Sequence, residues 1–212
     1  MTTIGFIGSG RVGSTVASLA IDAGYDVVLS NSRGPATLAD VIGRLGPKAR
    51  AATAAEAAAA ADIAVVSIPS KAYEFVPVEP LAGKVVIDTN DYYPQRDGQV
   101  AELDEHRTTS ASVLQGHLPG SKVVKAFNQI ESSQLASQGR SPGAADRRAL
   151  AIAGDDPEAK TTVSDFLDEI GYDAVDVGAL ADSWRIEPGT PGYGPWLDRA
   201  GLVAAFAAAE RG

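Results

Sequence analysis

The 212-residue chain contains no cysteine and only two histidines. Without cysteine it can form no disulfide, no thiolate nucleophile and no thiolate metal site. The two histidines, His106 and His117, do not have the spacing of metal ligands. We therefore expect no metal site in this protein.

Positive charge and long apolar runs are also scarce. Eighteen lysines and arginines stand against 27 acidic residues, which leaves a formal net charge of −9. Such a charge disfavours nucleic acid and anionic lipid as partners. No apolar run approaches membrane-spanning length, and no charged-then-apolar leader precedes the first apolar segment. The sequence predicts a cytoplasmic protein that binds neither nucleic acid nor membrane.

The most informative segment that is present is a glycine-rich turn near the N-terminus. Residues Thr3 to Ile7 form a short apolar run, which is typical of a buried strand, and Gly8-Ser9-Gly10-Arg11-Val12-Gly13 follows. The first glycine permits a sharp turn, the second lets the backbone approach a pyrophosphate, and the third lets a helix pack closely on the strand. An amphipathic helix follows as far as Gly24. This context predicts dinucleotide binding, with a mere structural turn as the alternative.

The end of the second expected strand decides between NAD and NADP. An NAD site places an aspartate or glutamate there to bind the adenosine ribose. This chain has Asn31-Ser32-Arg33 instead. Serine can donate a hydrogen bond to a 2′-phosphate, and arginine can hold that phosphate in a bidentate fork. The sequence favours NADP, the alternative being an exposed arginine in a polar loop.

Strand and helix signals alternate along the rest of the chain. The alternation predicts an α/β fold: a Rossmann-like, doubly wound, mostly parallel sheet covered on both faces by helices. A stretch rich in Ser, Gln, Gly and Ala over residues 130–146 is the best boundary. We expect an NADP-binding domain over residues 1–135, and strands and helices that complete the fold, bind the second substrate and form a dimer over residues 136–212. The later strands are expected at residues 48–52, 63–68, 84–89, 122–127, 149–153 and 173–177.

Three loops follow the carboxyl ends of expected strands, where ligands bind in sheets of this kind. We expect these loops to surround the nicotinamide. Each has a structural alternative, because a proline can end a strand, tyrosines can be packing residues and an asparagine can cap a turn. The loops contain Ser67-Ile68-Pro69, Asn90-Asp91-Tyr92-Tyr93 and Ala126-Phe127-Asn128.

With these loops in place, the sequence resembles the NADP-dependent coenzyme F420 reductase family (F420H2:NADP oxidoreductase). The resemblance covers most of the chain and includes the glycine turn, Asn31-Ser32-Arg33 and Ser67-Ile68-Pro69. Its most specific parts are residues 122–128 and Trp184-Arg185-Ile186-Glu187-Pro188-Gly189-Thr190-Pro191. It implies an eight-stranded sheet, a small C-terminal portion and a homodimer.

The resemblance also implies a chemistry and a set of contacts. Members of the family pass a hydride between the nicotinamide and the deazaflavin ring of F420, which needs proximity, orientation and exclusion of water more than an acid or a base. We accordingly assign no catalytic residue. The implied contacts are Ser9, Arg11 and Val12 with the pyrophosphate, Ser32 and Arg33 with the 2′-phosphate, and Ile68, Pro69, Asn90 and Ala126 around the nicotinamide.

One segment departs from the family pattern and leaves the second substrate open. Residues 90–98 are polar where a more apolar segment that lines F420 is expected. The partner is F420 or another flat redox molecule such as a flavin. Asp91, Tyr92 and Tyr93 could then face the second substrate, with one tyrosine as its proton donor.

Two other functions stay open beside the leading one. The chain could be a sensor that binds NADPH and reports the NADPH/NADP ratio to a protein partner, since no catalytic dyad is evident. It could also be a reductase of a C=N or C=O substrate, which needs a proton donor beside the nicotinamide.

Overall fold

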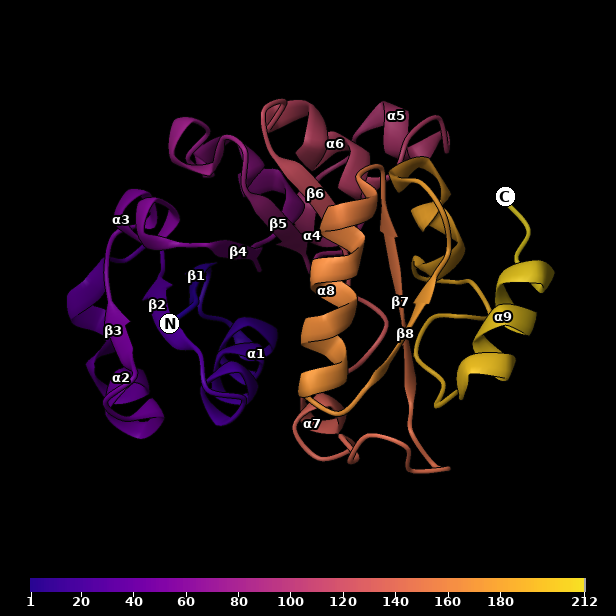
Figure 1. Cartoon of the computed structure of the whole chain (residues 1–212). Coiled ribbons are helices and arrows are strands. Elements are labelled where there is room, and N and C mark those ends of the chain that lie inside the picture. Colours follow the sequence, from indigo (N-terminus) through magenta and orange to yellow (C-terminus); the bar gives the residue numbers. More distant parts are fainter. Residues whose placement is uncertain (212) are drawn as a thin grey trace.

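The computed structural model describes residues 1–211, and their eight strands form one sheet with helices on both faces (Figure 1). The strand order is β3-β2-β1-β4-β5-β6-β7-β8. All neighbouring strands pair in parallel except β6 and β7, which are antiparallel. The predicted Rossmann-like, doubly wound, mostly parallel α/β fold is therefore confirmed.

Each expected strand is present, although several end earlier than the apolar pattern predicts. The expected strands 63–68, 84–89 and 122–127 leave the ladder after Val66, Asp88 and Lys125, because the residues that follow turn into loops. The strands are β1 (Thr3–Ile7), β2 (Asp26–Ser30), β3 (Ala49–Ala51), β4 (Ile63–Val66), β5 (Val85–Asp88), β6 (Lys122–Lys125), β7 (Ala149–Gly154) and β8 (Asp173–Asp176).

Helices alternate with these strands, and short 3-10 helices fill several of the loops. The 3-10 segments are Pro35–Leu38, Ser70–Phe75, Glu79–Leu81 and Leu180–Ile186. The α-helices are α1 (Arg11–Asp22), α2 (Ala39–Leu45), α3 (Ala54–Ala60), α4 (Pro94–Asp97), α5 (Ala101–Asp104), α6 (Ser110–His117), α7 (Ser132–Leu135), α8 (Pro157–Glu169) and α9 (Arg199–Ala208).

The alanine-rich helix α3 shows why small residues are needed against this sheet. Thr53 opens the helix with a capping box, since its hydroxyl accepts from the Glu56 backbone and the Glu56 carboxylate accepts from the Thr53 backbone. A Cβ atom on Gly5 of β1 would lie 2.3 Å from the carbonyl oxygen of Ala57. Glycine in the strand and alanine in the helix therefore let the two backbones approach closely.

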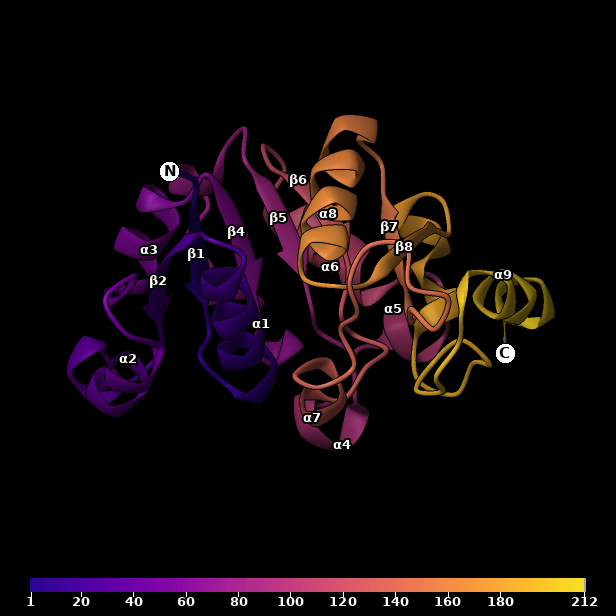
Figure 2. The ribbon, with the colours of Figure 1, turned by 60° about the horizontal axis from the view of Figure 1, so that its bottom comes forward.

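Two large apolar clusters lie on opposite faces of the sheet. Helices α1, α2 and α8 cover one face, while α3 and α6 cover the other. A smaller cluster joins β7 and β8 to α9, which stands apart from the other helices at that edge of the sheet (Figure 2). Because β7 and β8 continue the same sheet, the division after residue 135 stays a prediction.

The reversed strand β7 brings a second chain segment to the ligand edge of the sheet. Lys125 of β6 pairs with Ala153, and β7 runs the opposite way from there. The first residue of β7, Ala149, therefore lies beyond the carboxyl end of β6. The backbone N–H of Ala151 donates to the side chain of Gln129 in the loop after β6, at 3.1 Å.

Candidate cofactor and substrate site

The glycine turn joins β1 to α1, and its three glycines meet different constraints. Gly8 has a φ of +108°, and a Cβ there would lie 2.2 Å from the Ser67 carbonyl oxygen. A Cβ on Gly13 would lie 2.6 Å from the Gly8 carbonyl oxygen. A Cβ on Gly10, by contrast, would meet none of the described atoms within 4 Å. Packing therefore requires Gly8 and Gly13, whereas Gly10 faces open space.

That open space suits the pyrophosphate of a dinucleotide. Gly10 is the N-cap residue of α1, and within residues 1–211 no side chain caps the helix there. The free N–H groups of a first helical turn favour a negative group through hydrogen bonding and the helix dipole. A side chain at Gly10 would stand in the space that such a group needs.

Two cavities meet at this turn. The larger has a volume of about 600 Å³ and the smaller about 320 Å³. Both are lined by Gly10 and by the predicted Ser67-Ile68-Pro69 loop after β4. The smaller cavity continues to Ser9, to the end of β2 and to Phe75, a largely exposed aromatic side chain. A single ligand could therefore run from one cavity to the other across Gly10.

The loop after β2 is folded by its own asparagine. The Asn31 side chain accepts from the Arg33 backbone N–H at 3.0 Å and donates to the Thr37 hydroxyl at 2.9 Å. Asn31 and Ser32 line the smaller cavity, whereas the side chain of Arg33 is exposed on the same loop. Of the three residues expected to select NADP, two reach the cavity and the third stands in solvent beside it.

The loops after β4, β5 and β6 meet at the larger cavity as predicted for parallel strands. Phe127 makes the last of these turns with a φ of +65°, an uncommon conformation for a residue other than glycine, and its ring packs on Phe166. Ala126 is fully buried and, like Gly13, lines neither cavity. The predicted cofactor-binding residues that line the larger cavity are Gly10, Arg11, Val12, Ser67, Ile68, Pro69, Asn90, Phe127 and Asn128.

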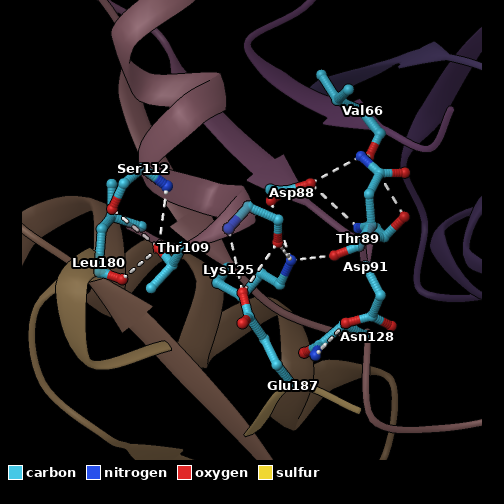
Figure 3. Close-up of polar contacts among 12 residues, drawn as sticks. Val66, Asp88, Thr89, Asp91, Thr109, Ser112, Lys125, Asn128, Leu180 and Glu187 are labelled. Atoms are coloured by element: carbon cyan, nitrogen blue, oxygen red, sulfur yellow. Dashed lines mark hydrogen bonds and ion pairs between the residues drawn. The ribbon is translucent and has the colours of Figure 1, made fainter. Parts of the chain in front are cut away.

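A buried ion pair fixes the loop after β5 (Figure 3). Lys125 and Asp88 have no exposed side-chain surface, and Lys125 Nζ lies 3.2 Å from Asp88 Oδ2. Lys125 also donates to the Asn90 carbonyl oxygen, and Asp88 accepts from the Asn90 side chain at 2.7 Å. Burial by itself lowers the pKa of Lys125, but the nearby carboxylates, with Asp88 first, outweigh it and raise that pKa.

Asp91 is a second buried acid, and it lies in the loop after β5, just beyond Asp88 in the sequence. Its Oδ1 accepts from the Asn128 side chain at 3.0 Å and its Oδ2 from the Tyr193 hydroxyl at 3.0 Å. Burial raises the pKa of Asp91 to about 6, although Lys125, Asn128 and Tyr193 all favour the charged form. Asp91 lines the larger cavity, so this buried carboxyl group with its raised pKa faces it.

The two tyrosines after Asp91 point in different directions. The Tyr93 hydroxyl lies 2.6 Å from the Tyr193 hydroxyl, and both residues line the larger cavity. The Tyr92 hydroxyl instead bonds to Asp104 and to the backbone of Gly98, and Tyr92 lines neither cavity. Of the three residues expected to face the second substrate, Asp91 and Tyr93 line the larger cavity and Tyr92 does not.

Sequence reasoning missed the C-terminal wall of the larger cavity. Tyr193 lies in the Gly- and Pro-rich tail, and an aromatic residue between two glycines was the only local signal. Arg148, immediately before β7, is fully buried and donates to the carbonyl oxygens of Gly194 and Pro195 and to the side chain of Gln134. Arg148 thereby holds the tail against α7 and keeps Tyr193 in the wall.

Neither a metal-binding cluster nor a membrane-spanning helix is found in residues 1–211. Residues 1–211 contain no group of three or more His, Cys, Asp and Glu side chains placed to hold a metal ion. Over the same residues, no helix combines the length and hydropathy needed to cross a bilayer.

Comparison with known proteins shows which family the N-terminal part resembles. Residues 3–92 match the family model described as NADP oxidoreductase coenzyme F420-dependent. The matched part runs from β1 to the loop after β5 and includes the glycine turn, Asn31-Ser32-Arg33 and the Ser67-Ile68-Pro69 loop. Through this region the chain is similar to the F420-dependent NADP oxidoreductase family. The predicted resemblance to this family is confirmed.

One curated relative is similar over most of the chain. Metalloreductase STEAP3 of Rattus norvegicus is 29% identical over 186 residues, which are 87% of this chain and 35% of the relative. The chain thus spans about a third of that relative's length.

Two solved structures are similar over nearly their whole length. One is a hypothetical protein, SMa0349 of Sinorhizobium meliloti, with a TM-score of 0.81 and 29% identity over 93% of this chain and 95% of that one. The other, from Arthrobacter sp. FB24, is provisionally described as an F420-dependent NADP reductase. It has a TM-score of 0.73 and 26% identity over 86% of this chain and 87% of that one.

Proposed function

We propose that this chain is an NADP(H)-dependent oxidoreductase that transfers a hydride between the nicotinamide and a flat redox partner, with coenzyme F420 as the first candidate. The observation that carries the proposal is the position of Gly10. It opens α1 toward free space at the point where the two cavities meet. A dinucleotide laid across this turn has its pyrophosphate at the helix N-terminus and one half in each cavity.

The residues of the smaller cavity suit the adenosine half. Ser32 offers a hydroxyl at the end of β2, and the exposed Arg33 stands on the same loop, free to swing toward a 2′-phosphate. No carboxylate among the described residues lines this cavity, so a phosphate there meets no repulsion from its walls. The absence of a wall carboxylate supports NADP over NAD.

The residues of the larger cavity suit the nicotinamide and a second substrate. Bound NADPH would supply the hydride. Ile68 and Pro69 present an apolar surface beside the turn, and Asn90 is held in place by Asp88. Asn128 has a buried carbonyl oxygen, Oδ1, with no partner among residues 1–211, and it is available to accept a hydrogen bond from a ligand. A buried acceptor without a partner is costly, which supports a ligand in this cavity.

The proposed cofactor contacts are those expected from the sequence. Gly13 and Ala126 line neither cavity, so their proposed role is to support the loops that bind the cofactor. The full set is Gly8, Ser9, Gly10, Arg11, Val12, Gly13, Asn31, Ser32, Arg33, Ser67, Ile68, Pro69, Asn90, Ala126, Phe127 and Asn128. The homodimer and the cytoplasmic location stay predictions from the sequence.

One observation favours a second candidate, a reductase of a C=N or C=O substrate. Such a substrate needs a proton at its heteroatom as well as a hydride at carbon. The hydroxyls of Tyr93 and Tyr193 lie in the larger cavity beside Asp91 and could supply that proton.

A binding titration and a turnover assay on the same sample test the proposal. NADPH and NADH are titrated first, and NADPH is then mixed with oxidised F420, a free flavin or the cyclic imine 1-pyrroline. We expect tighter binding of NADPH than of NADH and turnover with F420. Turnover with the imine alone supports the second candidate. Tight NADPH binding without any turnover supports the sensor function, and failure to bind NADPH refutes the proposal.

A further inference from the structure

Three titratable side chains stand in series along one wall of the larger cavity. Asp91 Oδ2 lies 3.0 Å from the Tyr193 hydroxyl, which lies 2.6 Å from the Tyr93 hydroxyl. All three residues line the cavity. The chain of hydrogen bonds therefore joins a buried carboxyl group to a phenol at the cavity surface, with one tyrosine between them.

We propose that Asp91, Tyr193 and Tyr93 form a proton relay for the second substrate, and that the protonation state of Asp91 sets the direction in which the relay passes protons. The proposal rests on the oxidoreductase function proposed above. Tyr93 is its terminal group at the substrate, while Tyr193 and Asp91 act through Tyr93.

The direction of proton transfer follows from whether Asp91 carries a proton. An ionised Asp91 can only accept, so Tyr193 gives it its single proton and accepts in turn from Tyr93. The Tyr93 oxygen then presents a lone pair to the cavity and can take a proton from a substrate. When Asp91 is protonated, every hydrogen bond reverses. Tyr93 then points its O–H at the cavity and can give a proton to a substrate.

The two states match the two directions of the reaction. Reduction of the acceptor takes a hydride from NADPH and one proton. As the acceptor's heteroatom gains its N–H or O–H bond, the Tyr93 O–H bond breaks, and protons shift from Tyr193 to Tyr93 and from Asp91 to Tyr193. Asp91 ends as a carboxylate and regains a proton from water. Oxidation runs the same steps in reverse, with NADP⁺ taking the hydride.

The charged groups around Asp91 keep both its protonated and its ionised form accessible. Lys125 on β6 favours the carboxylate, Glu187 after the last 3-10 helix opposes it, and Asn128 in the loop after β6 donates to it. Arg96 on α4 bonds to the Asp91 backbone oxygen and to the Asp97 carboxylate rather than to the Asp91 carboxyl group. Burial is the largest influence on the pKa of Asp91, which it raises to about 6. A group that titrates near neutrality can exchange a proton in either direction.

The same contacts could serve only as a latch that ties the tail to the loop after β5. A latch and a relay differ in what they do when pH changes. A latch holds Tyr193 in place whichever group carries the proton. Removing the Tyr193 hydroxyl from a latch would therefore change stability and KM by the same amount at every pH. In a relay, the pH dependence of kcat disappears when the hydroxyl of either Tyr93 or Tyr193 is removed.

The first test needs no substrate. The carboxyl ¹³C resonance of Asp91 is titrated by NMR in the ligand-free protein and identified by its loss in Asp91→Asn. We expect a midpoint near pH 6 in the wild type and a higher midpoint in Tyr193→Phe, because the carboxylate loses a hydrogen-bond donor. A midpoint near 4, or one that Tyr193→Phe leaves unchanged, would refute the relay. Because no substrate is present, this result is independent of the proposed function.

The second test follows turnover against pH with F420, or with 1-pyrroline if F420 does not react. We expect reductive kcat to fall and oxidative kcat to rise as pH passes through about 6. Tyr93→Phe and Tyr193→Phe should each lower kcat by roughly 10²- to 10⁴-fold, flatten both profiles and leave NADPH affinity within about twofold. Tyr92→Phe, whose hydroxyl lies outside the cavities, is the matched control and should keep the wild-type profile. Unchanged pH profiles in Tyr193→Phe would leave only the latch.

Discussion

The two walls of the larger cavity are built in opposite ways. The wall at the glycine turn comes from one strand, one turn and one helix, and what it offers a ligand is backbone. The opposite wall brings together Asp91, Asn128 and Tyr193 from three separate segments, and what it offers is side chains. A phosphate needs only N–H groups and open space, so local geometry suffices for the first wall. Acid–base chemistry needs titratable groups at defined distances, and long-range contacts must supply them.

The second wall consequently depends on buried polar contacts behind it. Lys125 and Asp88 hold the loop that carries Asp91, and Arg148 holds the tail that carries Tyr193. The first wall depends on small residues packed closely, with Gly8 against Ser67. Each substitution below alters one wall and leaves the other unchanged.

The largest effect is expected for Lys125→Met, which removes the cation behind the second wall. Asp88 would remain buried without its ion-pair partner, so we expect the free energy of unfolding to fall by about 3–5 kcal/mol. Denaturant titration measures it. Lys122→Met on the same strand is the control, because Lys122 pairs with Asp156 at the exposed surface. A similarly small loss in both variants would contradict the structural importance of the buried pair.

The next effect concerns Asp91 and the pH dependence of stability. The folded-state pKa of about 6 lies above the ordinary value of 3.8, so the folded protein binds this proton more tightly than the unfolded chain. The resulting stabilisation is fully present below about pH 4 and is lost as pH rises through about 6, a change of about 3 kcal/mol. Denaturant titrations from pH 4 to pH 8 should show this loss in the wild type relative to Asp91→Asn. A constant difference between the two proteins over that range is the contrary result.

Two alanine substitutions separate packing from binding in the first wall. Gly8→Ala should lower the free energy of unfolding by about 2–3 kcal/mol, because of its positive φ and the nearby Ser67 carbonyl. Gly10→Ala should leave stability unchanged, since its backbone conformation suits alanine and the space is open. It should nevertheless weaken NADPH binding about tenfold or more by filling the space for the pyrophosphate. Full NADPH affinity in Gly10→Ala would show that the dinucleotide lies elsewhere.

The smallest effect is expected for Arg33→Ala. Arg33 is exposed, so its loss should not alter folding. Loss of a charge-assisted contact with the 2′-phosphate should weaken NADPH binding by about 1.5 kcal/mol, or roughly tenfold, and leave NADH binding unchanged. Calorimetric titration with both cofactors measures the difference. Equal losses for NADPH and NADH would remove Arg33 from the 2′-phosphate site.

The parts of the fold and site that could be predicted are those with local causes. The glycine turn, the capping box at Thr53 and the alternation of strands with helices each depend on neighbours within a few residues. The apolar pattern places strand ends one or two residues too late, because residues that leave the ladder, such as Ile68 and Phe127, are as apolar as those within it. The direction of β7 leaves no mark in its apolar pattern, since a buried strand looks the same in either direction.

The parts that could not be predicted depend on contacts between distant segments. Asp91 and Tyr93 were candidates because they follow a strand, but Tyr92 has the same neighbours and turns the other way to bond with Asp104. Nothing near Tyr193 in the sequence indicates that it meets Asp91. Nothing near Arg148 indicates that a cation is buried there among neutral acceptors.

The separation between Asp91 and Tyr193 also has a consequence for the order of events on the ribosome. The two residues are 102 positions apart. At about 5–20 residues per second, translation needs on the order of 5–20 s to cover that distance. The glycine turn and β1 to β5 have already been synthesised during this interval, while the carboxyl group of Asp91 still lacks its tyrosine. In the nascent chain, the cofactor wall can therefore form before the acid–base wall.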